Sequence, residues 1–216
     1  MDLASPLRSI SPGLDSAVLQ VLAGTESGLS ATQIARLAPR GTRVGQIPVL
    51  NRLVEHGLVV AEPANHGFLY RLNREHVLAE AVLMVARART TILQRLTSAV
   101  GALRPEPAHV SVFGSFARGE AGPSSDIDLL VITPAGVELG DAWVDQLHAL
   151  TDQVLAWTGN RLQRVVMDAD RLHEAVAAGE PIVASWLTEA ITLSGASLEE
   201  LVRDVRRLST ATPARR

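Results

Sequence analysis

Two aspartates separated by one residue, Asp126 and Asp128, are the strongest candidates for chemistry in this chain of 216 residues. They stand at the start of the apolar run 127–133. Alternate residues of a strand point to the same side, so the two carboxylates converge. Their mutual repulsion is relieved when a cation lies between them, and such oxygen ligands suit Mg²⁺, which keeps waters and substrate phosphates as further ligands. We therefore predict a site for Mg²⁺, or for Mn²⁺ in its place, that receives a nucleotide.

A second group of polar residues follows the preceding apolar run, 110–113. Gly114 and Ser115 stand where a strand is expected to turn into a short helix, and there exposed backbone N–H groups can bind phosphate oxygens. Arg118 lies three residues further on, and its planar guanidinium suits bidentate hydrogen bonding to an oxyanion. Gly-Ser and Asp-x-Asp are each common when taken alone. Their order along the chain is what indicates one nucleotide site.

The stretch "GSFARGEAGPSSDIDLLV", residues 114–131, closely resembles the motif of the minimal nucleotidyltransferases in the DNA polymerase beta superfamily, relatives of kanamycin nucleotidyltransferase. The apolar runs 110–113, 127–133 and 162–167 alternate with helical stretches, with only helix expected after the third run, and this pattern predicts an α/β domain with a mixed sheet. The resemblance implies that this domain spans residues 105–200. It also implies transfer of a nucleoside monophosphate from a nucleoside triphosphate to an acceptor hydroxyl, with release of pyrophosphate. The residues that it implies are Asp126 and Asp128 as metal ligands, these two with Ser115 as catalytic residues, and Gly114, Ser115, Arg118 and Ser125 as nucleotide-binding residues.

A third carboxylate normally completes the site in this family, and here the sequence departs from the pattern. The expected strand reads "RLQRVVMDAD", residues 161–170, and has no acid among its central residues. Gln163 stands about where the acid is expected. Asp168 could take that role if the strand extends far enough, or it could cap the helix that follows. Without a third acid, nucleotide binding is better supported than catalysis.

The first part of the chain has the pattern of three helices followed by a hairpin. Ser30 and Gln33 stand in capping-box register, and the hairpin is expected around the turn 63–67. Residues 1–75 resemble a winged helix-turn-helix DNA-binding domain. On that reading the DNA contacts come from the exposed side of the third helix and from the tip of the wing, and the candidates are Arg43, Gln46, Asn51, Arg52 and His66.

Residues 76–104 contain neither glycine nor proline before Gly101 and are expected to form one long connecting helix. Its apolar stripe suits packing within the chain or the seam of a homodimer. The segment "RPEP", residues 104–107, is expected to end this helix and to mark the domain boundary. Residues 201–216 read as a basic C-terminal tail. Overall we expect an α+β chain.

Composition limits the partners. The formal net charge is −3 and the pI is about 6.1, so the chain lacks the basic excess of a strong non-specific nucleic-acid binder, and any DNA contact must be local. All 20 basic residues are arginine. There is no cysteine, which excludes disulfides and thiolate metal sites. Because no signal peptide or membrane span is evident, we expect a cytoplasmic protein with no membrane partner.

Two functions remain open. The first is a Mg²⁺-dependent nucleotidyltransferase with a nucleoside triphosphate as substrate and a winged-helix domain for DNA. Relatives of the minimal domain act in toxin–antitoxin modules and in antibiotic modification, so the acceptor could be a protein, an RNA or a small molecule. The second is a DNA-binding transcriptional regulator whose nucleotidyltransferase domain only senses nucleotide or is inactive.

Overall fold

The structure, a computed structural model, describes residues 1–65, 67–137 and 139–203. The chain divides into two compact units, Met1–Thr91 and Ile92–Arg216. The predicted boundary at residues 104–107 therefore differs from the observed one, which falls between Thr91 and Ile92. Within the described ranges, no helix is both long enough and apolar enough to cross a bilayer.

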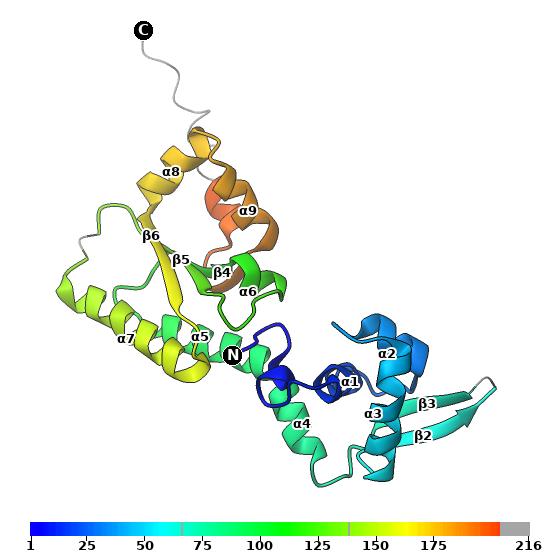
Figure 1. Cartoon of the computed structure of the whole chain (residues 1–216). Coiled ribbons are helices and arrows are strands. Elements are labelled where there is room, and N and C mark those ends of the chain that lie inside the picture. The colour runs from blue at the N-terminus through cyan, green and yellow to red at the C-terminus, as the bar shows by residue number, and fades with distance from the viewer. Residues whose placement is uncertain (66, 138, 204–216) are drawn as a thin grey trace. The chain divides into compact units, whose positions relative to one another are not determined.

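Three helices begin the first unit. The predicted capping box is confirmed, because the Ser30 hydroxyl accepts the backbone N–H of Gln33 while the Gln33 side chain accepts that of Ser30. The first helix starts at Leu14, and the third starts at Arg43 and contains Pro48. The helices are α1 (Leu14–Ala23), α2 (Ala31–Leu37) and α3 (Arg43–Glu55), as labelled in Figure 1. A short 3₁₀ helix, η1 (Pro6–Ser9), precedes them.

A small antiparallel sheet completes the first unit. The predicted hairpin consists of β2 (Val59–Ala64) and β3 (Gly67–Leu72), and the short β1 (Leu29–Ser30) pairs with β3, so that the strand order is β1-β3-β2. The three helices pack on the base of this hairpin, whose far end extends beyond them in Figure 1. The shared core is apolar and consists of Leu7, Val18, Leu22, Ile34, Leu50, Leu53, Leu58, Val59, Tyr70, Leu72 and Val82.

The long connecting helix predicted over 76–104 is wrong as a single element. It begins later and is broken at Arg87, which leaves α4 (Ala79–Ala86) and α5 (Ala88–Gly101). The side-chain amide of Gln20 donates to the backbone carbonyl of Ala86 at 3.4 Å. That carbonyl is one that a continuous helix would use, and a side chain inserted into the backbone ladder is a known cause of kinks. Because Val82 of α4 packs in the core of the first unit, α4 belongs there.

The second unit is built on a four-stranded sheet with the order β6-β5-β4-β7. β5 is parallel to β6 and antiparallel to β4, and β4 is antiparallel to β7, so the predicted mixed sheet is confirmed. The last strand, β7, was not predicted, because only helix was expected after the third apolar run. The strands are β4 (His109–Phe113), β5 (Ile127–Thr133), β6 (Leu162–Asp168) and β7 (Ile191–Gly195).

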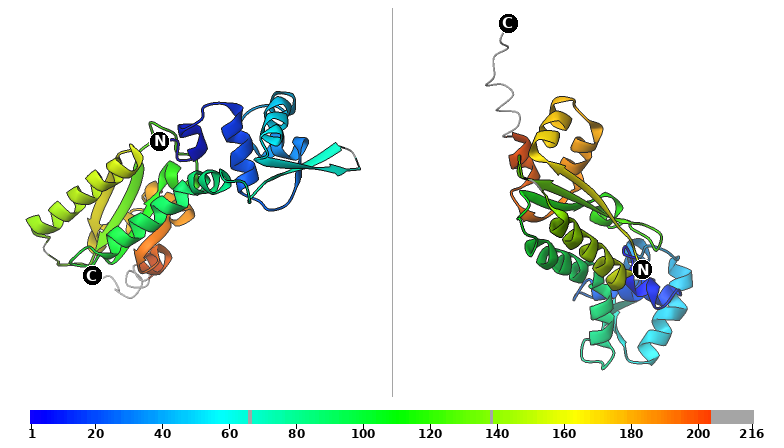
Figure 2. Two further views of the ribbon diagram at one scale, coloured as in Figure 1. Left: turned by 90° about the horizontal axis from the view of Figure 1, so that it is seen from below. Right: turned by 90° about the vertical axis from the view of Figure 1, so that its left-hand side faces the viewer.

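Helices cover both faces of this sheet. α5 and α7 (Asp141–Thr158) lie side by side on one face, and α8 (Ala169–Ala177) and α9 (Pro181–Glu189) lie on the other (Figure 2). Between α5 and α7, the Arg95 guanidinium lies 5.6 Å from the centre of the Trp157 ring. The core beneath α8 and α9 includes Leu130 and Ile132 of β5 together with Trp186. β5 is buried on both faces, which holds its first residues in a fixed position at the end of the sheet.

Candidate functional site

The Gly-Ser turn and the aspartate pair come together at one end of the sheet. β4 ends at Phe113, which pairs with Asp128 across the antiparallel ladder, and the short helix α6 (Gly114–Arg118) follows at once. Gly114 has a φ of +68°, in the left-handed region that favours glycine. A Cβ at this position would overlap the Asp128 carboxylate. Only glycine therefore allows the turn to lie against the aspartate, and Ser115 follows it in a half-buried position.

The two aspartates form a patch of concentrated negative charge. Asp126 is exposed just before β5, whereas Asp128 is half-buried within the strand. Burial raises the pKa of the Asp128 carboxyl, and the charges of Asp126 and Glu189 raise it further. A cation at this place would relieve both effects, so the residues present fit Mg²⁺. Among the described residues no group of three or more His, Cys, Asp or Glu side chains that could hold a metal ion occurs, and the candidate ligands are these two carboxylates.

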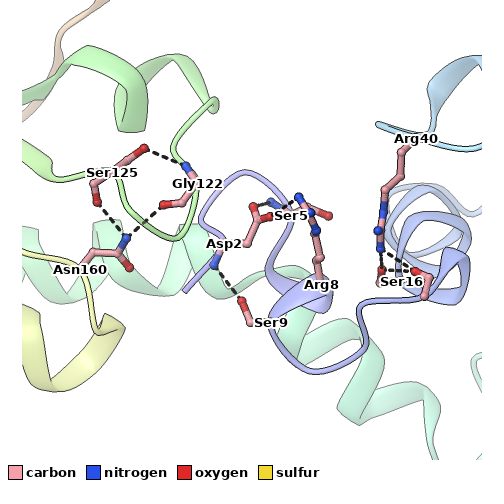
Figure 3. Close-up of polar contacts among 10 residues, drawn as sticks. Asp2, Ser5, Arg8, Ser9, Ser16, Arg40, Gly122, Ser125 and Asn160 are labelled. Atoms are coloured by element: carbon pink, nitrogen blue, oxygen red, sulfur yellow. Dashed lines mark hydrogen bonds and ion pairs between the residues drawn. The ribbon is translucent and has the colours of Figure 1, made fainter.

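A buried asparagine holds the loop that leads to Asp126. The Asn160 side chain is 2% exposed, and its amide donates to the backbone carbonyls of Gly122, Pro123 and Ser125 at 3.2, 3.4 and 2.9 Å. Figure 3 shows the bonds to Gly122 and Ser125. The Ser125 hydroxyl accepts the N–H of Gly122 at 3.0 Å, which closes the same turn. Sequence reasoning missed Asn160, because an asparagine between a helix and a strand looks like an ordinary loop residue.

Arg118 is held by two carboxylates. Its guanidinium donates to Glu120 at 2.8 Å and to Glu189, the last residue of α9, at 2.5 Å. The other oxygen of Glu189 accepts the backbone N–H of Gly114 at 3.1 Å and the hydroxyl of Ser185 at 3.0 Å. The hydrogen bond from Arg118 is the main reason that the pKa of Glu189 is lowered. Glu189 was not singled out in the sequence, and nothing within its own helix marks it.

The third carboxylate expected on the neighbouring strand is absent. Gln163 pairs with Asp128 in the parallel ladder of β5 and β6, so an amide occupies the place where the acid was expected. Asp168 pairs with Thr133, five residues further along the ladder, which is roughly 17 Å away. Its carboxylate accepts the N–H of Arg171 at 2.7 Å and caps α8. Of the two roles considered for Asp168, the helix cap is therefore the correct one.

Some of the candidate DNA-binding residues of the first unit are exposed, and one is buried. Arg43, Asn51 and Arg52 are exposed on α3, and Arg52 forms an ion pair with Asp15 of α1. Gln46 was expected on the exposed side, but it is fully buried, and its amide donates to the carbonyl of Arg40 at 3.1 Å.

The reason is helical spacing. Gln46 shares the inward stripe with the buried Leu50 and Leu53, four and seven residues further along the same helix. Gln46 therefore lies on the side of α3 that faces the core, whereas the other candidates on this helix lie on its exposed side. His66, the candidate at the wing tip, lies outside the described residues.

Comparison with known proteins finds a family model that matches part of the chain. Residues 93–173 match the family model described as a nucleotidyltransferase domain. The matched region runs from α5 through β4, α6, β5, α7 and β6 into α8, and it includes Gly114, Asp126 and Asp128. It ends before α9, so Glu189 lies outside it. A comparison with curated proteins finds no match.

Several solved structures are similar at a low level. A crystal structure of a toxin–antitoxin with AMP-PNP is 15% identical, with a TM-score of 0.37, over 55% of this chain and 86% of that chain. A mutant of the toxin–antitoxin MntA-HpeT is 12% identical with a TM-score of 0.36, over 55% and 86% of the two chains. Another MntA-HpeT mutant is 16% identical with a TM-score of 0.36, over 54% and 85%.

Replacing Asp128 by asparagine is expected to stabilise the metal-free protein at neutral pH. An aspartate with a raised pKa in the folded state destabilises that state above the folded pKa, and the cost disappears below the unfolded pKa. Because the carboxylate is only half-buried, solvent screens the repulsion and we expect a gain of at most about 1 kcal/mol. This corresponds to a rise in melting temperature of about 2–4 °C.

Tryptophan fluorescence measures this change, since Trp143, Trp157 and Trp186 all lie in the second unit and report on its unfolding. Wild type and Asp128→Asn should differ at pH 7 and converge at a pH below the ordinary pKa of an aspartate. Mg²⁺ should raise the melting temperature of the wild type more than that of the variant. A variant that melts lower than the wild type at pH 7 would contradict the charge argument.

Proposed function

We propose that the second unit is a Mg²⁺-dependent nucleotidyltransferase that moves a nucleoside monophosphate from a nucleoside triphosphate to an acceptor hydroxyl. The observation that carries the proposal is the packing of Gly114 against Asp128 within a region that matches a nucleotidyltransferase family model. This packing brings the candidate phosphate-binding turn and the candidate metal-binding carboxylates into one site. The mixed sheet supports the same proposal.

Each residue has a separate role in this proposal. Asp126 and Asp128 hold Mg²⁺, or Mn²⁺ in its place, and the metal supplies charge stabilisation at the phosphoryl group when it is bound. The N–H of Gly114, the hydroxyl of Ser115 and the guanidinium of Arg118 donate to phosphate oxygens. Ser125 acts mainly through the turn that it closes with Gly122, because its hydroxyl is already engaged there. Asn160 holds that turn in place.

The first unit is proposed to be a winged helix-turn-helix domain that binds DNA. Its order of elements supports this, since β1 lies between α1 and α2 and the hairpin of β2 and β3 follows α3. α3 would be the recognition helix and would present Arg43, Asn51 and Arg52. Gln46 is no longer a candidate, because its side chain is buried.

An alternative function is a DNA-binding regulator whose second unit only senses nucleotide or is inactive. The amide of Gln163 beside Asp128 favours this alternative, because the acid that would complete the metal site or accept the acceptor's proton is missing there. The two functions differ in what the aspartates do. Replacing Asp126 by asparagine removes the activity of an enzyme, whereas a regulator with an inactive second unit keeps its DNA binding unchanged.

A labelling experiment tests the proposal. The protein is incubated with Mg²⁺, a lysate of its host and α-labelled ATP, GTP, CTP or UTP, and it is compared with a variant that carries Asp126→Asn and Asp128→Asn. We expect label on a discrete protein or RNA with the wild type alone, because only the wild type keeps the metal ligands. Equal background label from both folded proteins would count against macromolecular transfer and favour the regulator.

A further inference from the structure

We infer that Glu189 is a built-in competitor of the nucleotide, because its carboxylate occupies the donors that the phosphates would need. The inference rests on the proposed function and adds a form of regulation to the same site. In the structure Gly114 and Arg118, two of the three proposed phosphate donors, both donate to one carboxylate. A nucleotide must therefore displace Glu189 before its phosphates can take these bonds.

The contacts of Glu189 resemble those of a bound anion. One carboxylate oxygen accepts the backbone N–H of Gly114 and the hydroxyl of Ser185, and the other accepts the guanidinium of Arg118. The side chain is only 12% exposed. Hydrogen bonds from a backbone N–H and a guanidinium to an anion are charge-assisted and strong. A carboxylate and a phosphate present similar oxygens, and the same N–H groups cannot serve both.

Glu120, the second carboxylate that contacts Arg118, does not occupy the backbone N–H of Gly114. It accepts only the Nε of Arg118 at 2.8 Å, its side chain is 63% exposed, and it does not contact Gly114. Such an exposed ion pair contributes little. Glu120 therefore provides a matched control, because it shares the arginine with Glu189 but not the turn.

The backbone at Glu189 is well placed for a side chain that blocks the site and then moves away. Glu189 ends α9, and two residues later Ile191 of β7 pairs with Val112 of β4, which lies two residues before Gly114. The end of α9 is thus fixed to the same strand that leads into the site. The inference requires only that the Glu189 side chain leaves Gly114 and Arg118, while the pairing of Ile191 with Val112 stays in place.

Charge adds to the competition. Glu189 acts electrostatically on Asp128, so the site holds a third negative charge beside the aspartate pair. This charge repels the phosphates of an incoming nucleotide, and the Glu189 carboxylate also occupies the hydrogen-bond donors of Gly114 and Arg118. Removing the charge while keeping the shape of the side chain therefore separates competition from a structural role.

The test is equilibrium binding of non-hydrolysable α,β-methylene analogues of ATP, GTP, CTP and UTP to the full chain with Mg²⁺, measured by calorimetry. Glu189→Gln keeps the size of the side chain but loses its charge, so the analogue should bind about tenfold more tightly, the difference expected between charged and neutral hydrogen bonds. Glu120→Gln should bind as the wild type does, within about twofold. Glu189→Asp is a second variant, too short to reach Gly114, and it should also bind more tightly.

The outcomes are distinct. If the wild type binds an analogue and Glu189→Gln binds it equally or more weakly, Glu189 supports the site and the competition is refuted, while the proposed function stands. If the wild type and both Glu189 variants, all folded by their tryptophan fluorescence, bind no analogue, the competition and the proposed nucleotide binding fail together. Binding that appears only in the Glu189 variants would support the inference most strongly.

Discussion

Replacing Gly114 by alanine is expected to remove measurable nucleotide binding and to destabilise the second unit. Alanine at a φ of +68° is strained, and its Cβ would overlap the Asp128 carboxylate, so either the turn or the aspartate must move. Strain and overlap together should lower the free energy of unfolding by about 2–5 kcal/mol. Nucleotide affinity should fall by about a hundredfold or more, since the turn and the metal ligands lose their common geometry.

Gly119 offers a matched control for this experiment. It has a φ of +76°, but a Cβ at Gly119 would meet nothing within 4 Å. Gly119→Ala therefore carries the conformational strain without the overlap and should lose only about 1–2 kcal/mol. Urea unfolding followed by tryptophan fluorescence, with calorimetry for the nucleotide, measures both quantities. If the two variants bind and unfold alike, the close approach of Gly114 to Asp128 has no role.

The second large effect is expected at Asn160. Asn160→Ala removes the donor shared by the three carbonyls of Gly122, Pro123 and Ser125, in a place where water has little access. Unsatisfied buried groups are costly, so the free energy of unfolding should fall by about 2–4 kcal/mol. Because this loop leads directly into Asp126, the proposed transfer activity should fall even at temperatures where the variant remains folded.

Asn160→Asp tests the cause of that loss. Aspartate has the same shape, but its carboxylate cannot donate and repels the three carbonyl oxygens, so this variant should be at least as unstable as Asn160→Ala. Asn51→Ala, at an exposed position of the first unit, should leave the tryptophan-monitored transition unchanged. A stable, fully active Asn160→Asp protein would show that hydrogen bonds do not position the loop.

Local signals in the sequence determined much of this protein. The capping box of α2, the hairpin of the first unit and the alternating strands and helices of the second depend on neighbouring residues, and each was predicted. The order of Gly114, Ser115, Asp126 and Asp128 also lies within one short stretch. These residues lie close together because β4 and β5, which follow one another along the chain, pair antiparallel. The sequence alone therefore indicated a common site.

Other features depended on partners that are distant along the chain. Glu189 meets Gly114 and Arg118 across 75 and 71 residues, and Gln20 meets the Ala86 carbonyl across 66 residues to interrupt the expected helix. Gln163 was recognised as the substitute for an acid, but only the register of β5 and β6 placed it beside Asp128.

The physical reason for this division is the same in each case. A cap, a turn or a strand pattern is decided by interactions within a few residues, which the order of amino acids displays directly. The partner of a long-range hydrogen bond is decided by strand order and helix packing, which no local pattern encodes. The sequence therefore indicated the candidate residues for binding a metal and a nucleotide. Only the tertiary structure decided that Asn160 holds the loop before Asp126 and that Glu189 occupies the proposed phosphate donors.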